Sequence, residues 1–394
     1  MKAVILAAGK GTRMRGLCDN TPKPLIPIGN RSIISVVFTR LRSMGVDEVA
    51  LVIGHQGEQL QKAIGDGSRY GVSVTYVWQK EQLGTGHAAL LCEDFVGRDA
   101  FVLIFGDIIT SADNYPEMAK VFQAGKCDAV LTVFPVEDPS NGAAVDVKDG
   151  FVAGIVEKPP PGTMLNAYNN AGIFIWPAEI FDRIRSLKKS TRGEYEFTDG
   201  IIDFLNAGRR LAAFELRGYW ENISDPEACI RMNQNVLAEA LPPNDPKVHG
   251  GAKIGKGTRI TGSNIAAGVT VATGCKLDGS TLGENCTLGP NVTADYAEVQ
   301  AGAAIGEGCK LGAGVSIGEG AVIEANVRIG PNASIGPGCV VREGASVTSS
   351  ILLGGATVGA GSSLVHVMLD ANTQVESGEM ITGTPEKTVE ILRR

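Results

Sequence analysis

Up to about residue 240, short apolar runs alternate with amphipathic stretches along the chain. The runs of strand length are residues 3–6, 49–53, 72–78, 101–105 and 129–134. Segments such as residues 33–44 and 87–94 carry their apolar residues at helical spacing instead. This alternation predicts an α/β domain with a mostly parallel, Rossmann-like sheet and right-handed crossovers. Ligands of such sheets bind beyond the carboxyl ends of the strands, so candidate functional residues are sought in the loops that follow them.

Beyond residue 247 the period changes to six. Aliphatic residues recur at every sixth position, and a small or β-branched residue stands two positions before each of them. The uninterrupted part of the series is Val299, Ile305, Leu311, Ile317, Ile323, Ile329, Ile335, Val341 and Val347. A helix cannot keep every sixth residue on one face, whereas a coil with three short flat sides and tight glycine turns can. The repeat therefore predicts a parallel β-helix.

The two patterns divide the chain into predicted domains. Residues 1–240 form the first domain, and residues 248–376 carry the hexapeptide repeats. Residues 241–247 read LPPNDPK, and their three prolines predict a linker. Residues 377–394 are expected to form a C-terminal tail that folds as a helix over the end of the coil.

Composition narrows the class of protein and its partners. The 394 residues carry a formal net charge of −7, which gives no reason to expect nucleic acid as a partner. No apolar run approaches the roughly 20 residues that span a bilayer, so no membrane partner is expected. Eight cysteines without a CxxC pair indicate reduced thiols in a cytoplasmic protein. Four of these cysteines fall at the small inward position of the repeat and are expected to fill its core, namely Cys275, Cys286, Cys309 and Cys339.

The first apolar run continues into the glycine-rich, basic stretch AVILAAGKGTRM. Its apolar part is about seven residues long and has no small-residue cleavage site behind it, so an export signal is excluded. The stretch fits neither GxxxxGK[ST] nor GxGxxG, because Lys10 follows the first glycine and Met14 stands where a third glycine belongs. What remains is a loop with close-approaching backbone amides and Arg13, followed by Lys23 in PKPLIPIG. Such a loop can wrap a polyphosphate.

LAAGKGTRM followed by PKPLIPI resembles the signature of the sugar-1-phosphate nucleotidyltransferases, the pyrophosphorylases that make nucleoside-diphosphate sugars. The resemblance covers residues 1 to about 237. A left-handed parallel β-helix of hexapeptide repeats is common in the same family, and the handedness expected here comes from that resemblance. It implies that a nucleoside triphosphate and a sugar 1-phosphate react to give the NDP-sugar and diphosphate.

The resemblance also implies roles for residues in the loops after the strands. The positions under the base and ribose are Leu6, Ala8, Gly9 and Gly11, while Arg13 and Lys23 grip the triphosphate. QKEQLGTGHA is similar to the stretch that reads uracil in N-acetylglucosamine-1-phosphate uridylyltransferases, and its matching residues are Gln79, Gln82, Gly84 and Thr85. Asp107 of FGD matches a magnesium ligand, and Asn222 of GYWEN matches its partner. Arg13, Lys23 and Asp107 are therefore the candidate catalytic residues, with Mg²⁺ as cofactor.

The sugar side of the site follows from the same resemblance. The matching residues are Glu157, Lys158, Asn170 and Thr198, with Glu194 and Tyr195 as further pocket walls. The family usually has a glycine in the loop matched by PSNGAAV. Ala143 occupies that place without a gap, and Gly142, which is also a candidate sugar-binding residue, comes one residue early. This departure leaves open whether the site fits a sugar with an N-acetyl group or one with a hydroxyl group.

Several alternatives stay open. QLGTGHA favours UTP with N-acetylglucosamine 1-phosphate or glucose 1-phosphate, whereas the long loop between Arg13 and Lys23 looks more like glucose-1-phosphate thymidylyltransferases. In bifunctional relatives the β-helix transfers acetyl to glucosamine 1-phosphate, and here His366 is the one candidate base for that reaction. A non-catalytic nucleotide-sugar sensor is an alternative of another class. β-Helices of the family often associate, so a homotrimer through the β-helix is expected.

Overall fold

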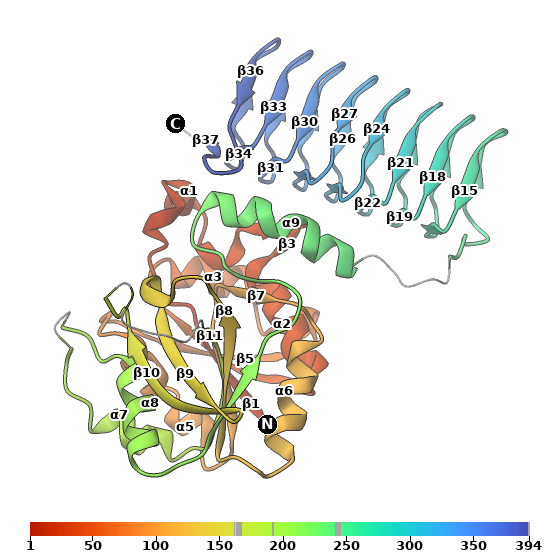
Figure 1. Cartoon of the computed structure of the whole chain (residues 1–394). Coiled ribbons are helices and arrows are strands. Elements are labelled where there is room, and N and C mark those ends of the chain that lie inside the picture. Colours follow the sequence, from red (N-terminus) through yellow and green to blue (C-terminus); the bar gives the residue numbers. More distant parts are fainter. Residues whose placement is uncertain (161, 163–167, 191–192, 241–245, 393–394) are drawn as a thin grey trace. The chain divides into compact units, whose positions relative to one another are not determined.

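The computed structural model describes residues 1–160, 162, 168–190, 193–240 and 246–392 (Figure 1). The chain forms two compact units. The first unit consists of Met1–Gly11, Pro22–Leu25 and Ile33–Asn222. The second consists of Thr12–Thr21, Ile26–Ser32 and Ile223–Arg394, so two short pieces of the N-terminal region belong with the repeats. The boundary near residue 223 lies before the predicted one at residue 240.

The described part of the first unit is built on a nine-stranded sheet with the order β5-β4-β1-β6-β11-β8-β12-β10-β9. Its strands are β1 (Lys2–Leu6), β4 (Glu48–Ile53), β5 (Ser73–Trp78), β6 (Phe101–Phe105), β8 (Ala129–Pro135), β9 (Ala143–Lys148), β10 (Phe151–Glu157), β11 (Tyr168–Trp176) and β12 (Leu211–Glu215). The pairs among β5, β4, β1 and β6 are parallel, as the alternating pattern predicts. Strands β9, β10 and β11 pair antiparallel with their neighbours and make the other half of the sheet mixed. A separate ribbon pairs β7 (Ile108–Thr110) with β13 (Trp220–Asn222).

Helices cover both faces of this sheet. They are α2 (Ile33–Ser43), α3 (Gly57–Ile64), α4 (Thr85–Leu90), α5 (Glu93–Val96), α6 (Asn114–Gln123), α7 (Ile180–Arg185) and α8 (Phe197–Asn206). Val4 and Phe101 share a buried apolar cluster with residues of α4, α7 and α8, while their strand neighbours point to the opposite face, where α2 and α6 lie. The helix expected over residues 87–94 is divided into α4 and α5. The five predicted strands are all present.

In the second unit, over residues 246–392, three parallel sheets of eight strands stack into a solenoid. One sheet contains β14 (Lys253–Ile254), β17 (Thr270–Val271), β20 (Thr287–Leu288), β23 (Ala304–Ile305), β26 (Val322–Ile323), β29 (Val340–Val341), β32 (Thr357–Val358) and β35 (Gln374–Val375). The second contains β15 (Arg259–Thr261), β18 (Lys276–Asp278), β21 (Thr293–Asp295), β24 (Lys310–Leu311), β27 (Arg328–Ile329), β30 (Ser346–Thr348), β33 (Ser363–Val365) and β36 (Met380–Thr382). The third contains β16 (Asn264–Ile265), β19 (Thr281–Leu282), β22 (Glu298–Val299), β25 (Ser316–Ile317), β28 (Ser334–Ile335), β31 (Ile351–Leu352), β34 (Val367–Leu369) and β37 (Val389–Ile391).

The register of the solenoid explains the slips in its repeat. Leu282 pairs with Val299, and Val299 pairs with Ile317, so one coil has 17 residues and the next has 18. A 17-residue coil is three hexads with one residue removed at a corner. The strands nevertheless stay in register, because the change is absorbed in a turn and not in the ladder.

The interior of the solenoid is filled by the two predicted sets of residues. Every member of the aliphatic series from Val299 to Val347 is at most 3% exposed, and the small residues two positions earlier are equally buried. The four predicted core cysteines are fully buried. Burial raises the pKa of the Cys339 thiol to about 11, which keeps it protonated at neutral pH. These cysteines are structural, as expected.

Glycine follows many of the inward aliphatics because adjacent coils approach closely. A Cβ on Gly318 would lie 2.5 Å from the backbone nitrogen of Pro337 in the next coil. A Cβ on Gly306 would lie 2.7 Å from the backbone nitrogen of Ala325. Neither glycine has a positive φ, so the requirement is space and not backbone conformation.

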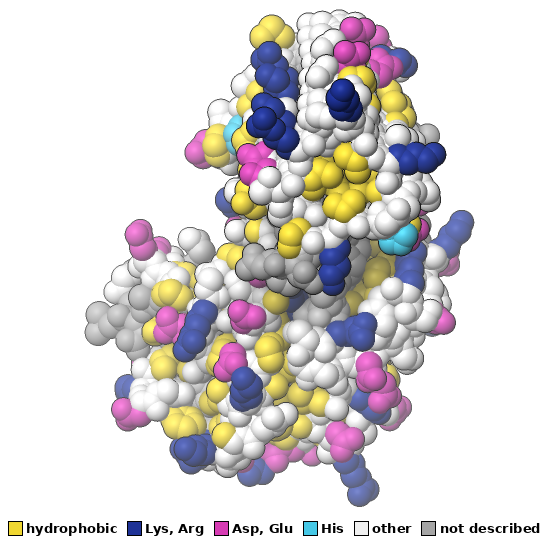
Figure 2. Space-filling model, turned by 90° about the vertical axis from the view of Figure 1, so that its right-hand side faces the viewer, with side chains coloured by type: hydrophobic (Ala, Val, Ile, Leu, Met, Phe, Trp, Pro, Cys, Tyr) yellow, Lys and Arg dark blue, Asp and Glu magenta, His cyan; other side chains and the backbone are white. Residues whose placement is uncertain are grey.

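The C-terminal end of the solenoid differs from the prediction. The expected C-terminal helix over residues 377–394 is wrong, since the described part of this segment forms β36 and β37, which add to the stack. Most of the predicted linker, residues 241–245, lies outside the described residues. Figure 2 looks onto the first coil and shows hydrophobic side chains at this end, where Val248 and Ile254 are 49% and 39% exposed.

Ahead of the solenoid, the second unit contains α9 (Pro226–Ala240), α1 (Leu17–Asn20) and the short ribbon of β2 (Pro27–Ile28) and β3 (Arg31–Ser32). Helix α9 packs against β2. The N-terminal pieces therefore contribute a helix turn and a ribbon to the unit that carries the repeats.

Candidate functional site

Four loops of the first unit meet at the carboxyl end of its parallel strands. The amide of Ala7 donates to the carbonyl of Val52 at 2.9 Å, which continues the pairing of β1 with β4 beyond Leu6. The amide of Gly106 donates to the carbonyl of Leu6 at 2.9 Å, so the loop after β6 is fixed to the end of β1. The sheet therefore gathers the predicted base-binding and metal-binding segments at one edge, as the topology rule predicts.

Lys23 and Asp107 form an ion pair in this unit. The ammonium nitrogen of Lys23 lies 2.5 Å from Oδ2 of Asp107, which comes directly after β6 and its short loop. Lys23 lies in the single-turn 3-10 helix Lys23–Leu25, and both side chains are partly buried. The predicted triphosphate cation and the predicted metal ligand are thus brought together.

The ribbon of β7 and β13 places Asn222 near the loop that carries Asp107. In this ribbon Asn222 pairs with Ile108, which is the residue that follows Asp107. Its Oδ1 is buried and accepts no hydrogen bond from the described part of the chain. A carboxylate and an unpartnered amide oxygen are the hard oxygen donors that Mg²⁺ prefers, with phosphate oxygens and water completing an octahedron.

The two residues offer oxygen donors and no nitrogen or sulfur ligand of the kind that Zn²⁺ prefers. Among the described residues, no group of three or more His, Cys, Asp and Glu side chains is placed to hold an ion. A softer metal such as Zn²⁺ would need such a cluster of nitrogen and sulfur ligands. Asp107 and Asn222 offer oxygen donors, which suit a hard cation such as Mg²⁺.

The two glutamines predicted to read the base lie beside the first loop. Nε2 of Gln82 donates to the carbonyl of Ala8 at 2.8 Å, so the segment after β5 is held against the segment after β1. Nε2 of Gln79 donates to the carbonyl of Gly84 at 3.1 Å and lies 3.2 Å from Nδ1 of His87. Gln79 is buried, whereas Gln82 is exposed. These bonds fix Gln79 within its own loop and leave the carbonyl oxygen of Gln82 available.

Gly84 and Thr85 contact the segment that carries the predicted sugar-pocket walls. A Cβ on Gly84 would lie 2.6 Å from the carbonyl oxygen of Tyr195, and φ of Gly84 is +103°. The amide of Phe197 donates to the hydroxyl of Thr85 at 3.1 Å. Gly84 and Thr85 thus hold this segment against α4. Packing therefore explains why a glycine and a threonine stand at these positions, apart from any contact with nucleotide.

The predicted sugar-binding residues lie around the ends of β10 and β11. The hydroxyl of Thr198 donates to the carboxylate of Glu157 at 3.3 Å. The amide of Lys158 donates to the carbonyl of Gly142 at 2.9 Å, and the side chain of Lys158 is exposed. Oδ1 of Asn170 accepts from the amide of Gly172 at 2.9 Å. The structure therefore joins Thr198 with Glu157 and Lys158 with Gly142, whereas Asn170 is bonded within its own strand.

A close neighbour of Gly142 explains why this position has no side chain. Its backbone is extended, and a Cβ there would lie 2.8 Å from the side-chain amide group of the buried Asn169. Ala143, which stands at the family's usual glycine position, begins β9. The glycine one residue early thus serves packing against β11.

Arg13 is the one candidate catalytic residue outside the first unit. Gly9 is exposed and Gly11 has φ of +66°, a conformation that favours glycine. Arg13 follows in the single-turn 3-10 helix Thr12–Met14, where its side chain is exposed. This turn belongs to the second unit, so the two predicted triphosphate cations, Arg13 and Lys23, fall in different units.

Two residues that support the site were missed from the sequence. Nε1 of Trp220 donates to the carbonyl of Ala171 at 2.9 Å, and the indole stacks on Phe134 with ring centres 3.7 Å apart. A Cβ on Gly172 would lie 2.8 Å from the ring of Phe105. Trp220 and Gly172 thus pack the middle of β11 against β13, which carries Asn222, and against Phe105 at the end of β6. Their presence within the motifs GYWEN and NNAGIF was the signal that could have found them.

His366, the candidate base for acetyl transfer, lies in a turn between β33 and β34. Its φ is +51°, and Nδ1 is buried without a hydrogen-bond partner in the described chain. Its backbone amide donates to the carbonyl of Thr348, and its own carbonyl accepts from Val389.

Comparison with known proteins assigns the first part of the chain. The profile of the family described as "Nucleotidyl transferase" matches residues 2–239. The chain belongs to this family. A second profile, described as "GMPPB C-terminal domain", matches residues 315–389 within the solenoid.

Curated relatives of this nucleotidyltransferase come from several organisms. The low-salt glycan biosynthesis nucleotidyltransferase Agl11 of Haloferax volcanii is 36% identical over 242 residues, which cover 61% of this chain and 67% of the relative. The UTP–glucose-1-phosphate uridylyltransferase AglF of the same organism is 33% identical over 244 residues, covering 61% and 98%. The chain is thus a nucleotidyltransferase, and one of these two relatives is named for glucose 1-phosphate.

A solved structure supports the same assignment. A Bacillus anthracis protein described as a glucose-1-phosphate thymidylyltransferase, crystallised with sucrose, superposes with a TM-score of 0.55 at 31% identity. The match covers 62% of this chain and 98% of that one.

Two further findings bear on the environment of the protein. Among the helices of the described residues, none is long and apolar enough to cross a membrane. All eight cysteines are free thiols.

Proposed function

We propose that this nucleotidyltransferase joins UTP or dTTP to a sugar 1-phosphate, with Mg²⁺, and releases diphosphate. An oxygen of the sugar 1-phosphate attacks the α-phosphorus and forms a new P–O bond. The bond between the α-phosphorus and the β-phosphate oxygen breaks, and that oxygen leaves with diphosphate. The attacking phosphate is already ionised, so the reaction needs no general base.

One observation carries this proposal. The Lys23–Asp107 ion pair stands at the carboxyl end of β6, and Asn222, whose buried Oδ1 has no partner among the described residues, lies opposite Ile108, the residue after Asp107. A cation next to two hard oxygen donors suits a triphosphate that is shared with a divalent ion. A site that only bound a neutral sugar would gain nothing from this arrangement of charges.

The work of the chain in this reaction is positioning and neutralisation of charge. Lys23 would hold the triphosphate oxygens, and Asp107 with Asn222 would hold Mg²⁺, which when bound offsets negative charge on the phosphates. Arg13 is the second cation proposed for the triphosphate. Lys158 at the end of β10 is exposed and is proposed to meet the sugar phosphate.

The choice of nucleotide rests on Gln79 and Gln82. An amide side chain both donates and accepts hydrogen bonds, as the imide edge of uracil or thymine requires. Uracil and thymine differ by one methyl group, for which discrimination is about 1–3 kcal/mol, so dual use of UTP and dTTP is proposed. The relatives point both ways, since one is named a uridylyltransferase and another a thymidylyltransferase. The proposed acceptors are N-acetylglucosamine 1-phosphate and glucose 1-phosphate.

We further propose that the solenoid mediates assembly as a homotrimer and that the protein works in the cytoplasm. The regular stack of β-strands and the free thiols are the observations that support these two points. Sedimentation equilibrium of the full chain tests the first.

The deciding experiment measures diphosphate release with Mg²⁺ over a grid of nucleotides and sugar phosphates. UTP, dTTP and GTP are each combined with glucose 1-phosphate and N-acetylglucosamine 1-phosphate. The variant is Asp107→Ala, and the matched control is Asp99→Ala, an exposed aspartate just before the other end of β6. Release that is lost in Asp107→Ala and kept in Asp99→Ala supports the proposal. A folded protein that binds UTP and releases no diphosphate in any combination would instead be a nucleotide sensor.

A further inference from the structure

The segment that carries Lys23 belongs alternately to the two compact units along the chain. Thr12–Thr21 belongs to the second unit, Pro22–Leu25 to the first, and Ile26–Ser32 to the second again. Lys23 therefore lies on a four-residue stretch whose two flanks are both part of the unit built on the solenoid. The contacts of those flanks determine how firmly each end of this stretch is held.

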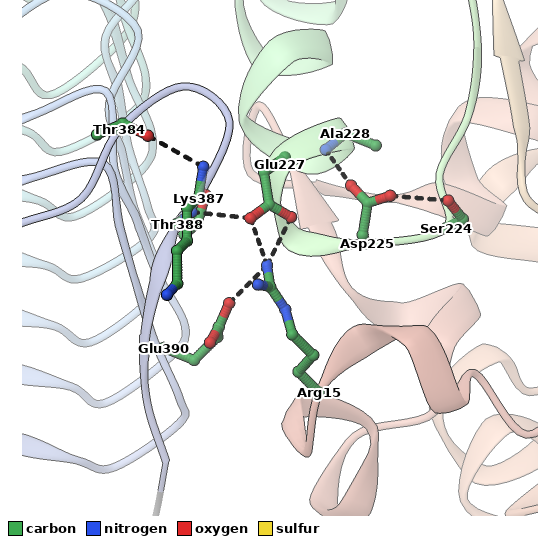
Figure 3. Close-up of polar contacts among 9 residues, drawn as sticks. All are labelled: Arg15, Ser224, Asp225, Glu227, Ala228, Thr384, Lys387, Thr388 and Glu390. Atoms are coloured by element: carbon green, nitrogen blue, oxygen red, sulfur yellow. Dashed lines mark hydrogen bonds and ion pairs between the residues drawn. The ribbon is translucent and has the colours of Figure 1, made fainter.

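The first flank is held by Arg15 (Figure 3). A terminal nitrogen of Arg15 lies 2.5 Å from both carboxylate oxygens of Glu227 and 2.7 Å from Oε1 of Glu390. Glu227 is in the first turn of α9, and Glu390 is on β37. The amide of Thr388 also donates to Glu227 at 2.8 Å. One arginine thus ties the flank both to α9 and to the last coil.

The second flank is held by Arg31 and Asn30. Arg31 makes a two-pronged contact with the carboxylate of Glu298 on β22, at 2.7 and 3.0 Å. Nδ2 of Asn30 donates to the hydroxyl of Ser316 at 3.0 Å and to the carbonyl of Ile335 at 2.8 Å. These partners lie on three successive coils of the solenoid. A bidentate arginine–carboxylate contact fixes orientation as well as distance.

Both flanks contain a residue in an unfavourable backbone conformation. Arg15 has φ of +50° and Asn30 has φ of +54°. A residue other than glycine persists in this region only where its surroundings determine it strongly, and for arginine the cost is larger than for asparagine. The side-chain contacts of Arg15 and Asn30 supply that determination.

The stretch between the flanks is short and stiff. Pro22 and Pro24 fix φ on either side of Lys23, and the amide of Leu25 donates to the carbonyl of Pro22 at 2.8 Å. A stiff tether transmits the positions of its ends, because it has few internal rotations to absorb a displacement.

We propose that Arg15 and Arg31 are positioning residues for nucleotidyl transfer. By fixing both flanks on the solenoid unit, they pre-order the backbone of Lys23 and of Arg13, and so lower the entropy lost when the triphosphate binds. The solenoid is then part of the machinery that orders the phosphate-binding segment. This inference rests on the proposed function, since it assigns Lys23 and Arg13 to the triphosphate.

The test compares three variants of the full-length protein, Arg15→Met, Arg31→Met and the control Arg328→Met. Arg328 is an exposed arginine on β27 of the same solenoid. We expect amide hydrogen exchange over residues 12–32 to quicken in the first two variants without substrate. We also expect the KM of the nucleoside triphosphate to rise about three- to thirtyfold in them. The conservative variants Arg15→Lys and Arg31→Lys should show smaller increases in exchange rate and KM than the methionine variants. A lysine keeps the charge but not the two-pronged contact.

A double-mutant cycle separates this role from general loss of stability. Glu298→Gln, Arg31→Met and the double variant should give non-additive changes in the KM of the nucleoside triphosphate. The thermal midpoint of each of these variants should equal that of the control Arg328→Met. An unchanged exchange rate over residues 12–32 together with an unchanged KM in Arg15→Met and Arg31→Met would overturn the proposal. If the wild-type protein releases no diphosphate, the proposed function fails, and the exchange rates still decide whether these arginines order the segment.

Discussion

The ammonium nitrogen of Lys23 lies 2.5 Å from Oδ2 of Asp107, although 84 residues separate the two in the chain. The side chains of Lys23 and Asp107 are 12% and 28% exposed, so the pair is shielded from water on most sides. The cation proposed for the triphosphate and the carboxylate proposed for Mg²⁺ therefore occupy one place. A change to either residue is expected to alter the charge that the other one experiences.

Replacing Lys23 by methionine should lower kcat for diphosphate release by about 10²–10³-fold, because a preorganised cation is lost where phosphate charge develops. Steady-state kinetics with saturating UTP and Mg²⁺ measure this effect. Lys120→Met is the control, since Lys120 is an exposed lysine paired with Glu117 on the surface of α6. A kcat of Lys23→Met equal to that of the control would contradict the role given to Lys23.

Asn222 should set the affinity for magnesium. Asn222→Asp adds a carboxylate beside Asp107 and should lower the half-saturating Mg²⁺ concentration by roughly tenfold, because ligand charge tunes affinity for hard cations. Asn222→Ala should raise that concentration. Magnesium titrations of activity measure both shifts. Two shifts of the same sign would be incompatible with Asn222 acting as a ligand.

Gln82 should contribute to binding of the base. Gln82→Leu removes a side chain that can donate and accept, and its amide also holds the carbonyl of Ala8. We expect KM for UTP to rise by about two- to tenfold, the value of one or two ordinary hydrogen bonds. Gln61→Leu on the exposed face of α3 is the control. If KM for UTP rises equally in both variants, the loop does not read the base.

Gly318 should be needed for the stacking of coils. In Gly318→Ala the new methyl group would lie 2.5 Å from the backbone nitrogen of Pro337, so the coils must shift apart. We expect a loss of about 1–3 kcal/mol in the free energy of unfolding. Gly250→Ala is the matched control, because a Cβ there meets no atom within 4 Å and φ is not positive. Chemical denaturation of both variants provides the comparison.

Glu390 should make stability depend on pH. Burial raises the pKa of its carboxyl above the ordinary value, against the opposing effect of Arg15 and with a further upward effect of Glu227. The folded protein thus holds this proton more tightly than the unfolded chain does. The contribution to stability is complete below the unfolded pKa and is lost as pH rises through the folded pKa.

Glu390→Gln, which mimics the protonated form, should therefore have the higher thermal midpoint at about pH 7. The difference from wild type should close towards about pH 4, where Glu390 itself is protonated. Thermal melts across this range measure the effect. A variant that is less stable than wild type at neutral pH, with the difference again closing towards low pH, would reverse the sign and contradict the raised pKa.

Local patterns in the sequence were enough to predict much of the fold. The buried runs of β1, β4 and β6 and the six-residue period of the solenoid depend on neighbouring residues alone, and they are confirmed. The C-terminal helix was predicted wrongly because the last coil is irregular. Leu364 pairs with Ile381 17 residues later, but Leu369 pairs with Ile391 22 residues later, so the insertion hides the period.

The candidate site shows a similar division. Asp107 and Asn222 were named as a pair only through motifs that the family resemblance supplied, and the ribbon places Asn222 opposite Ile108, the residue after Asp107. The contact of Arg15 with Glu227 spans 212 residues, and no local pattern in either segment announces it. Gly84 and Gly142 were predicted from their likeness to binding loops, whereas their close packing against Tyr195 and Asn169 depends on segments far along the chain.

The contacts of Arg15 also have a consequence for synthesis of the protein. Arg15 is synthesised before its partners, since Glu227 follows 212 residues later and Glu390 later still. At about 5–20 residues per second, the nascent phosphate-binding segment waits tens of seconds for its full set of partners. A chain released before its last coil would carry the nucleotidyltransferase motifs without the residues that hold their segment in place. Completion of the final coil is therefore a step in the maturation of the site.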